Sequence, residues 1–302
     1  MYNGILLLNK EPGFTSHDAV AKLRGILRFR RIGHAGTLDP MAQGLLVMLL
    51  GKATRASEYA SGAEKEYIAD FILGVETDTQ DTTGNVLAEA PVNVTESQLR
   101  QALSSFEGGY DQVPPMYSAI QKDGVRLYDL ARKGKEVERE SRFIALPLLE
   151  LLSFDPPRGK LRVRCSKGTY IRTLCHDLGQ RLGCGGAMSA LTRVQAGDFS
   201  LEDALTLREV EQLVKEGTLQ QHILPADRLF ASLPAVTLTE EGAKRARNGA
   251  HAAQKHLLSG AIPPVDSLCR VYTPEGEFLM TGKGGLLDMG PPAIFCHKIF
   301  GE

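Results

Sequence analysis

A chain of 302 residues has the length of about two domains, and 43% hydrophobic with 24% charged residues is typical of a folded globular protein. Its longest nearly apolar run, residues 44–51, is far shorter than the ~20 residues of a membrane-spanning helix, and no secretory signal is predicted at the N-terminus. Five cysteines without a C-x-x-C pair predict neither a disulfide framework nor a zinc ribbon, so a cytoplasmic location is expected.

The net charge of −1 conceals an uneven distribution of charged residues. Residues 160–193 hold seven basic residues and one acidic residue, and the first 60 residues hold eight basic and four acidic ones. Residues 64–111 carry the opposite excess, with ten acidic residues against two basic ones. A basic face on a nearly neutral protein would attract phosphate groups locally. Ordinary solvent-exposed faces of helices and strands would explain the imbalance equally well.

The first part of the chain alternates predicted strands and helices. After a turn at residues 11–13, Thr15 or Ser16 caps a helix, and residues 30–40 predict a basic loop that contains glycines. A second helix opens at Thr95 with a capping box. Short apolar runs predict strands at residues 5–9, 45–50 and 65–73. The buried stripes of the two helices are expected to consist of Val20, Leu23 and Leu27, and of Leu99, Leu103 and Phe106.

The middle of the chain predicts an insertion followed by paired strands. Residues 112–142 begin with prolines and mix basic with polar side chains, which indicates an exposed excursion. Residues 143–154 and 161–165 predict adjacent strands that lead into a helix at residues 170–182. Strands separated by helices, with two strands in direct succession, are typical of an α+β domain with a mixed sheet.

A domain boundary is predicted within residues 227–234, where a polar helical stretch ends and the composition changes. The chain continues with a small helix capped by Thr239 and then with short strands and turns. We therefore expect a larger α+β domain over residues 1–227, with a mixed, mostly antiparallel sheet and flanking helices, and a small β-rich domain over residues 228–302.

Residues 33–40, with the sequence GHAGTLDP, form the most informative segment. Two glycines and a proline produce an irregular loop, and Pro40 biases Asp39 toward an extended conformation that points its carboxylate outward. A structural turn, with Asp39 accepting backbone N–H bonds, would use the same residues. His34 and Asp39 have no third ligand nearby in the sequence, so no metal site and no other cofactor are expected.

Five segments, in order along the chain, resemble one enzyme family. Residues 33–40, with Gly44 and Leu45, are similar to the nucleophile motif G-H-x-G-x-L-D-P-x-x-x-G-x-L of the TruB family of tRNA pseudouridine synthases. The other segments resemble the motifs K-P-x-G-x-T-S (with Glu11 as a variation), K-x-Y, P-P-x-Y-S-A-x-K and C-S-K-G-T-Y-I-R-T-L, at residues 10–16, 65–67, 114–122 and 165–174. The agreement covers residues 1 to about 200. Residues 191–194 depart from it, because LTRV stands where the family has L-R-R-T.

The resemblance implies an activity and a set of site residues. The family isomerises the uridine at position 55 in the T loop of tRNA to pseudouridine. The resemblance implies that Asp39 is the catalytic carboxylate and that Arg172 is its partner. It also implies that Tyr67 stacks on the uracil and removes the carbon-5 proton. The base leaves its stack, and His34 is expected to fill the vacated position. Further substrate contacts are expected from Tyr170, Leu191, Lys10 and Arg55. Lys10 has the alternative role of supporting the loop, and core packing would explain Leu191 equally well.

The resemblance also implies how the RNA is held. Residues 112–142 are expected to form a thumb-like insertion that closes over the T stem-loop, and the C-terminal domain to be a PUA-like RNA-binding domain. Basic residues among aromatic ones suit phosphate contact and base stacking. The expected RNA contacts are Lys122, Arg126, Arg132, Lys133, Lys135 and Arg193. We expect a monomer that acts on tRNA without a protein partner or membrane.

Alternatives from other classes use some of the same features. A non-catalytic tRNA-binding or tRNA-folding protein would have the same basic surface, but binding alone does not need a carboxylate in a phosphate-facing cleft. A metal-dependent nuclease needs clustered Asp, Glu or His residues, which the sequence near Asp39 lacks. A guide-RNA-dependent pseudouridine synthase is the nearest alternative, although the chain lacks long basic extensions. The sequence leaves open whether Asp39 attacks the sugar or the base.

Overall fold

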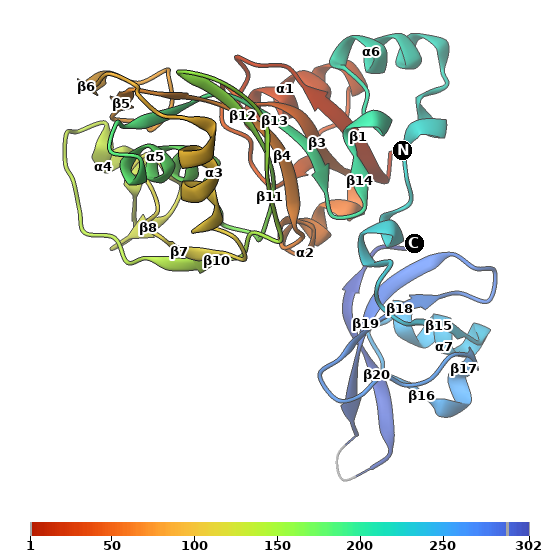
Figure 1. The fold of residues 1–302 in the computed structure, drawn as a ribbon. Coiled ribbons are helices and arrows are strands. Elements are labelled where there is room, and N and C mark those ends of the chain that lie inside the picture. Colours follow the sequence, from red (N-terminus) through yellow and green to blue (C-terminus); the bar gives the residue numbers. More distant parts are fainter. Residues whose placement is uncertain (1, 288–289, 302) are drawn as a thin grey trace.

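The chain forms a larger body around an eight-stranded sheet and a smaller body around a six-stranded sheet (Figure 1). This computed structural model describes residues 2–287 and 290–301, so residues 1, 288–289 and 302 of the two expected domains lie outside the described residues. In the larger sheet the strand order is β1-β3-β13-β4-β12-β11, with β2 paired to β3 and β14 to β13. The strands are β1 (Gly4–Lys10), β2 (Ile32–Ala35), β3 (Gln43–Leu50), β4 (Lys65–Leu73), β11 (Leu148–Asp155), β12 (Arg158–Cys165), β13 (Gly186–Ala196) and β14 (Phe199–Ser200).

The sheet is mixed and mostly antiparallel, as predicted. Only the pairing of β13 with β3 is parallel among the pairings of these strands. The helices of the larger body are α1 (Ser16–Leu27), α2 (Ser57–Ser61), α3 (Glu96–Ser104), α4 (Leu127–Ala131), α5 (Ile171–Arg181) and α6 (Leu207–Glu216). Short 3-10 helices are η1 (Gly51–Ala56), η2 (Leu201–Asp203), η3 (Leu219–His222) and η4 (Ala226–Phe230).

Local capping signals place the first two long helices. Thr15, and not Ser16, is the N-cap of α1, and it forms a capping box with Asp18. Thr95 forms the predicted capping box of α3 with Gln98. These bonds satisfy backbone N–H groups that the first turn of a helix leaves without partners. The predicted apolar stripes are confirmed, because the core contains Val20, Leu23, Leu27, Leu99, Leu103 and Phe106.

Three parts of the larger body differ from the sequence prediction. The predicted loop at residues 30–40 contains the short strand β2. The single strand predicted over residues 143–154 is divided into β10 (Arg142–Ile144), which pairs with β7 (Tyr110–Gln112), and β11. Pro147 separates the two, and a proline cannot donate a hydrogen bond to a sheet. The central strand β13 and the hairpin β5 (Val75–Thr77) and β6 (Val86–Glu89) were not predicted.

The insertion predicted at residues 112–142 is exposed over much of its length but anchored at two points. It contains the small hairpin β8 (Gln121–Lys122) and β9 (Val125–Arg126), followed by α4. Leu127 and Ser118 are buried, and the backbone N–H of Tyr128 donates to the carbonyl of Ser118 at 3.1 Å. In Figure 1 this segment lies at the same end of the larger body as α3 and α5.

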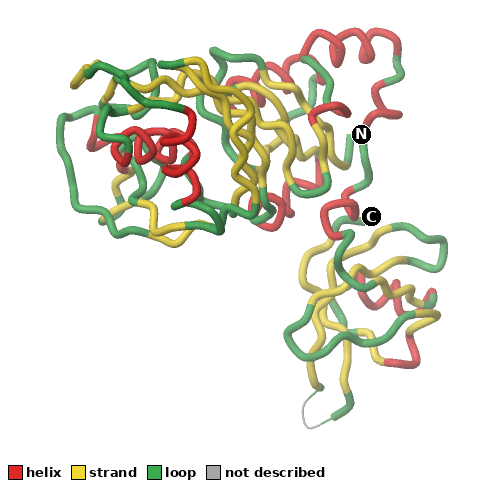
Figure 2. Tube along the Cα trace, viewed as in Figure 1, coloured by secondary structure: helices red, strands yellow, loops and turns green. Residues whose placement is uncertain are grey.

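The smaller body consists mainly of strands, as Figure 2 shows. Its sheet has the order β16-β20-β19-β18-β15-β17. Its elements are β15 (Ala235–Leu238), α7 (Glu240–Arg247), β16 (Ala252–Ala253), η5 (Gln254–His256), β17 (Leu257–Ser259), β18 (Leu268–Tyr272), β19 (Phe278–Leu286) and β20 (Pro292–Ile299). Thr239 caps α7, as predicted.

Aromatic packing joins the two bodies. The ring of Phe230 on η4 contacts Tyr59 on α2 at 4.6 Å and Phe300 at 5.5 Å between ring centroids. Phe278 stacks on Phe300 at 5.2 Å. Large aromatic side chains dominate the energetics of such contacts, so this cluster holds the end of the chain against the larger body. Among the described residues, no helix is both long and apolar enough to cross a membrane.

Candidate active site

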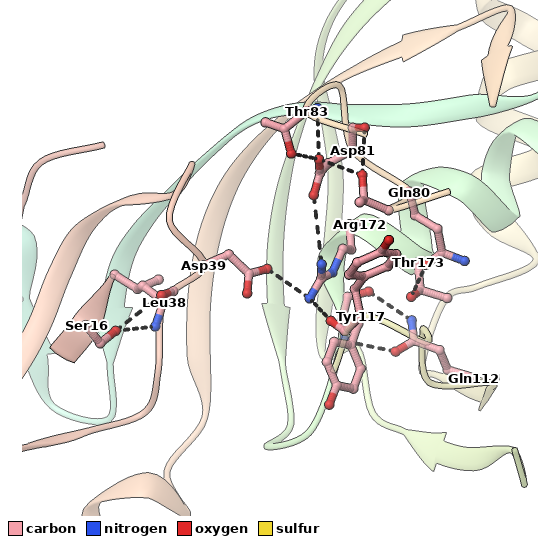
Figure 3. A network of polar contacts seen from close by, with 12 residues as sticks. Ser16, Leu38, Asp39, Gln80, Asp81, Thr83, Gln112, Tyr117, Arg172 and Thr173 are labelled. Carbon is pink, nitrogen blue, oxygen red and sulfur yellow. Dashed lines mark hydrogen bonds and ion pairs between the residues drawn. The ribbon is translucent and has the colours of Figure 1, made fainter. Parts of the chain in front are cut away.

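The loop that carries Asp39 connects β2 to β3 and is held by side chains from two helices. Ser16 at the start of α1 accepts a hydrogen bond from the Leu38 backbone N–H at 2.9 Å and donates to the Leu38 carbonyl at 3.2 Å (Figure 3). The Gly36 N–H donates to Ser61 Oγ on α2 at 3.2 Å. Asp39 itself stays accessible, with 37% of its side chain exposed. These hydrogen bonds fix the backbone of the loop, while the carboxylate of Asp39 stays accessible to a substrate.

Arg172, in the first turn of α5, faces this carboxylate. Its Nη2 lies 3.1 Å from Oδ2 of Asp39 and also donates to the Tyr117 carbonyl at 2.9 Å (Figure 3). Only 9% of the Arg172 side chain is exposed. The planar guanidinium can therefore hold the Asp39 carboxylate in a fixed direction through a charge-assisted pair. The contact expected between Asp39 and Arg172 is present, and its catalytic role stays a prediction.

Sequence analysis missed a second carboxylate beside Arg172. Asp81 lies in the turn between β5 and β6, and its Oδ2 is 3.8 Å from Nη1 of Arg172 (Figure 3). Its Oδ1 accepts hydrogen bonds from the Thr83 backbone and hydroxyl and from the Thr79 hydroxyl. Asp81 is buried, so it fixes one prong of the guanidinium and leaves the other for Asp39. In the sequence, Asp81 resembles Asp78, and no local signal separates the two.

Three further candidates lie on β4, directly before α5 and on β13. Tyr67 on β4 is buried, and burial raises the pKa of its phenol. Tyr170 precedes α5, and its ring centroid lies 5.9 Å from the Arg172 guanidinium. Burial raises the pKa of Tyr170 as well. Leu191 on β13 is buried in the same core cluster as Tyr67.

Lys10 lies behind the loop and not on its open side. Its Nζ donates to the carbonyls of Glu11 at 3.0 Å, Phe14 at 2.7 Å and Pro40 at 3.5 Å. The residue is 1% exposed. This geometry fits the alternative role of supporting the loop better than direct substrate contact.

Replacing Lys10 by Met is expected to change how stability depends on pH. Burial lowers the pKa of Lys10 to about 8, so above this pH the folded chain releases a proton that the unfolded chain keeps until about pH 10.4. In this window the unfolded state binds more protons, and the free energy of unfolding of the wild type rises with pH relative to the Met variant. Urea unfolding on both sides of pH 8 measures the difference. Parallel pH curves for the two proteins would contradict a titrating amine at this position.

The structure corrects the prediction for Arg193. It was expected to bind RNA, but it is 1% exposed, and its Nε and Nη2 donate to the carbonyls of Leu45 at 2.6 Å and Gly36 at 3.0 Å. A side chain without accessible surface cannot contact a phosphate. It lies on β13 between β3 and β4, and its guanidinium is enclosed by the Asp39 loop and the start of β3, whose carbonyls it binds.

Among the described residues, no hydrogen bond or ion pair joins His34 or Arg55 to Asp39 or Arg172. The ring of His34 on β2 packs edge-to-face on His17 at 5.5 Å, and its Nδ1 is buried without a hydrogen-bond partner. Burial, and then the charge of His17, lowers the pKa of His34. Arg55 on η1 donates to the Ile299 carbonyl at 2.6 Å, so it joins the two bodies.

The five basic candidates of the insertion lie on its exposed surface. The guanidinium groups of Arg126 and Arg132 lie 5.8 Å and 5.4 Å from the ring centroid of Tyr128. Cations beside an aromatic ring form a surface suited to phosphates and bases. The exposed set is Lys122, Arg126, Arg132, Lys133 and Lys135. Across the described residues, no three His, Cys, Asp or Glu side chains are grouped so that they could hold a metal ion.

Comparison with known proteins identifies the family. A model of the N-terminal domain of TruB family pseudouridylate synthases matches residues 24–171, and a model of the tRNA pseudouridylate synthase B C-terminal domain matches residues 172–231. The chain belongs to the TruB family. Both TruB models end before β15, so the sheet of the smaller body lies outside them. The resemblance predicted from five sequence segments is confirmed.

Curated relatives in the TruB family match most of the chain. The tRNA pseudouridine synthase B of Opitutus terrae is 54% identical, over 70% of this chain and 88% of the relative. That of Pseudomonas aeruginosa is 47% identical over 80% of each chain. That of Syntrophotalea carbinolica is 40% identical, over 95% of this chain and 91% of the relative.

Solved structures extend the similarity to the whole fold. A Cbf5-Nop10-Gar1 complex contains a chain with a TM-score of 0.76 and 28% identity, matched over 99% of this chain and 85% of that chain. An H/ACA RNP bound to a substrate RNA containing 2′-deoxyuridine contains one with a TM-score of 0.75 and 26% identity, matched over 99% and 85%. The predicted pseudouridine-synthase fold, with a small β-rich domain after it, is confirmed.

Proposed function

We propose that this chain isomerises uridine to pseudouridine at position 55 in the T loop of tRNA. The observation that carries the proposal is the accessible carboxylate of Asp39 held 3.1 Å from the buried guanidinium of Arg172, in a chain that belongs to a pseudouridylate synthase family. The relatives are named tRNA pseudouridine synthase B, which supports tRNA as the substrate.

The reaction is an isomerisation, so every atom of the uridine is retained. The glycosidic bond from N1 to the sugar breaks, the uracil rotates in place, and a bond from carbon 5 to the sugar forms. The proton on carbon 5 then leaves, its bonding electrons restore the C5–C6 double bond, and N1 takes up a proton. An ionised carboxylate is needed for attack on either the sugar or the base, and Asp39 supplies it beside Arg172.

Other residues of the site are assigned to holding the flipped base. Tyr67 is the proposed platform for the uracil and, as its phenolate, the acceptor of the carbon-5 proton. Tyr170 and Leu191 are the proposed walls of the pocket. His34 is proposed to fill the place that the base leaves, because it is only partly buried on β2, the strand that leads into the Asp39 loop.

The insertion is proposed as the surface that binds the T stem-loop, and the smaller body as a PUA-like RNA-binding domain.

Replacing Lys133 and Lys135 together by Gln is expected to flatten the log–log salt dependence of RNA binding by roughly one to two units. Each lysine that contacts a phosphate releases counterions from the RNA on binding, so the double variant releases fewer of them. Single-turnover chemistry at saturating enzyme should change little. RNA binding is measured by titration at several salt concentrations.

A matched control for this prediction lies on α6, which is far from the insertion in Figure 1. Arg208 and Lys215 are both exposed there, and Lys215 forms a surface ion pair with Glu211. Their double replacement by Gln removes the same charge and should leave the slope as in the wild type. Equal slopes for the two double variants would contradict an RNA-binding role of the insertion.

The function is tested with the pure chain and an unmodified T-arm stem-loop in excess chelator. We propose that the protein acts as a monomer without metal, nucleotide, guide RNA or protein partner, so pseudouridine should form at one position. A guide-dependent enzyme would leave the stem-loop unchanged until a guide is added, and a tRNA-folding protein would bind without converting it. Loss of turnover that a divalent ion restores would contradict the cofactor-free proposal. A short stem-loop avoids the effect of Mg²⁺ on the folding of whole tRNA.

A further inference from the structure

Arg193 is a buried cation that lies against both the loop of Asp39 and the tyrosine platform. Its Nε and Nη2 donate hydrogen bonds to backbone carbonyls, those of Leu45 and Gly36. Over residues 2–287 and 290–301, no carboxylate lies within ion-pair distance of it. Carbonyl dipoles compensate only part of the cost of burying a charge. The surroundings of Arg193 therefore favour a negative charge formed next to it.

The register of the sheet identifies Tyr67 as the group on which that charge can form. Arg193 on β13 and Tyr67 on β4 are directly opposite each other in an antiparallel pair, which puts their side chains on the same face. Burial raises the pKa of Tyr67, whereas the charge of Arg193 and a hydrogen bond from its side chain lower it. The arginine thus favours the ionised phenol from the strand position directly paired with the tyrosine.

The backbone of Arg193 is held as firmly as its side chain. In the parallel pairing of β13 with β3, Arg193 is opposite Gly44, and a Cβ at Gly44 would come within 2.4 Å of the Arg193 carbonyl oxygen. On the other side, a Cβ at Gly36 would lie 3.3 Å from Nη1 of Arg193. Both glycines belong to the segment that carries Asp39. Arg193 is therefore packed directly onto that segment and cannot shift without moving it.

We propose that Arg193 is a positioning residue that holds the Tyr67 hydroxyl in a defined place relative to the Asp39 loop and stabilises the Tyr67 phenolate. The inference rests on the proposed function. In the last step of that reaction the phenolate oxygen of Tyr67 takes the proton from carbon 5, while the C–H electron pair forms the C5–C6 double bond and N1 gains a proton from water. Arg193 touches no reacting atom and acts through Tyr67.

The test compares stem-loops that carry protium or deuterium on carbon 5 of the target uridine, in single turnovers at saturating enzyme. Arg193→Met removes the charge and should slow the reaction by about 10²-fold or more, as expected for the loss of an effective proton acceptor. Arg193→Lys keeps the charge but loses the planar fork, and should slow it by about 10-fold. Because proton removal then limits the rate, the protium-to-deuterium rate ratio should be high in both variants, and higher in the Met variant.

Ser61→Ala is the matched control, because Ser61 also holds Gly36, and among the described residues its hydroxyl bonds to Gly36 and Ser57 and not to Tyr67. Loosening the loop impairs the step that uses Asp39, so in this variant the rate falls while the isotope ratio stays at or below that of the wild type. Arg193 variants with the same ratio as Ser61→Ala would overturn the proposal and leave Arg193 as a support of the loop. Should Arg193→Met fail to fold, as thermal unfolding would reveal, Arg193→Lys against Ser61→Ala decides the question. A wild type that forms no pseudouridine would instead reject the proposed function, and the inference with it.

Discussion

Replacing Asp39 by Asn is expected to lower single-turnover formation of pseudouridine by at least about 10⁴-fold, while the affinity for the stem-loop stays within a few-fold. The amide has nearly the same shape as the carboxylate but lacks its negative charge and its nucleophilic power. Asp39 is 37% exposed on a loop held by Ser16 and Ser61, so the substitution should not unfold the loop. The measurement is the rate at saturating enzyme, with binding followed separately.

Asp70 on β4 offers a matched control for Asp39. Its side chain is 38% exposed, nearly the same as that of Asp39, and it forms a surface pair with Lys160 at 3.2 Å. Surface pairs of this kind contribute little to stability, so Asp70→Asn should retain full activity. An Asp39→Asn protein that reacts within ten-fold of the wild type, with Asp70→Asn unchanged, would mean that Asp39 is not the catalytic carboxylate.

Replacing Arg172 by Lys is expected to reduce the rate by about 10²- to 10³-fold, which corresponds to about 3–4 kcal/mol from a weakened charge pair that is expressed in the transition state. Lys keeps the positive charge but cannot reach Asp39, Asp81 and the Tyr117 carbonyl at once, as the fork of Arg172 does. Because Asp39 is partly exposed, water compensates part of the lost pairing, and the lower end of the range is expected.

Arg172→Met should be worse than Arg172→Lys. It leaves the buried Asp81 without its counter-ion and removes the positive charge that holds the carboxylate of Asp39 in place. Arg100→Lys is the control, since Arg100 pairs only with Glu96 on the exposed face of α3 and should tolerate the change. A near wild-type rate for Arg172→Lys, accompanied by weaker RNA binding, would make Arg172 a phosphate clamp and not the partner of Asp39.

Local features of the chain could be read from the sequence alone. The capping box at Thr95, a cap at Thr15 or Ser16 and the bounds of β4 follow from residues that are neighbours in the chain. Asp39 and Arg172 were identified in the same way, because their motifs preserve a particular order of side chains. Helix caps, alternation of side chains and short motifs are properties of a few consecutive residues, so they are visible without a fold.

The positions of Asp81, Arg193 and strand β13 could not be read from the sequence. Each depends on residues distant in the chain: Asp81 meets Arg172 across the site, and Arg193 is covered by β3 and β4. Nothing in the local sequence distinguishes an arginine on the surface from one enclosed between two strands. The sequence by itself thus determined two charged groups of the candidate site, Asp39 and Arg172, and the loop that presents Asp39. Only the tertiary structure decided which charged groups are accessible, as Asp39 is, and which are buried, as Asp81 and Arg193 are, because burial is set by contacts between distant parts of the chain.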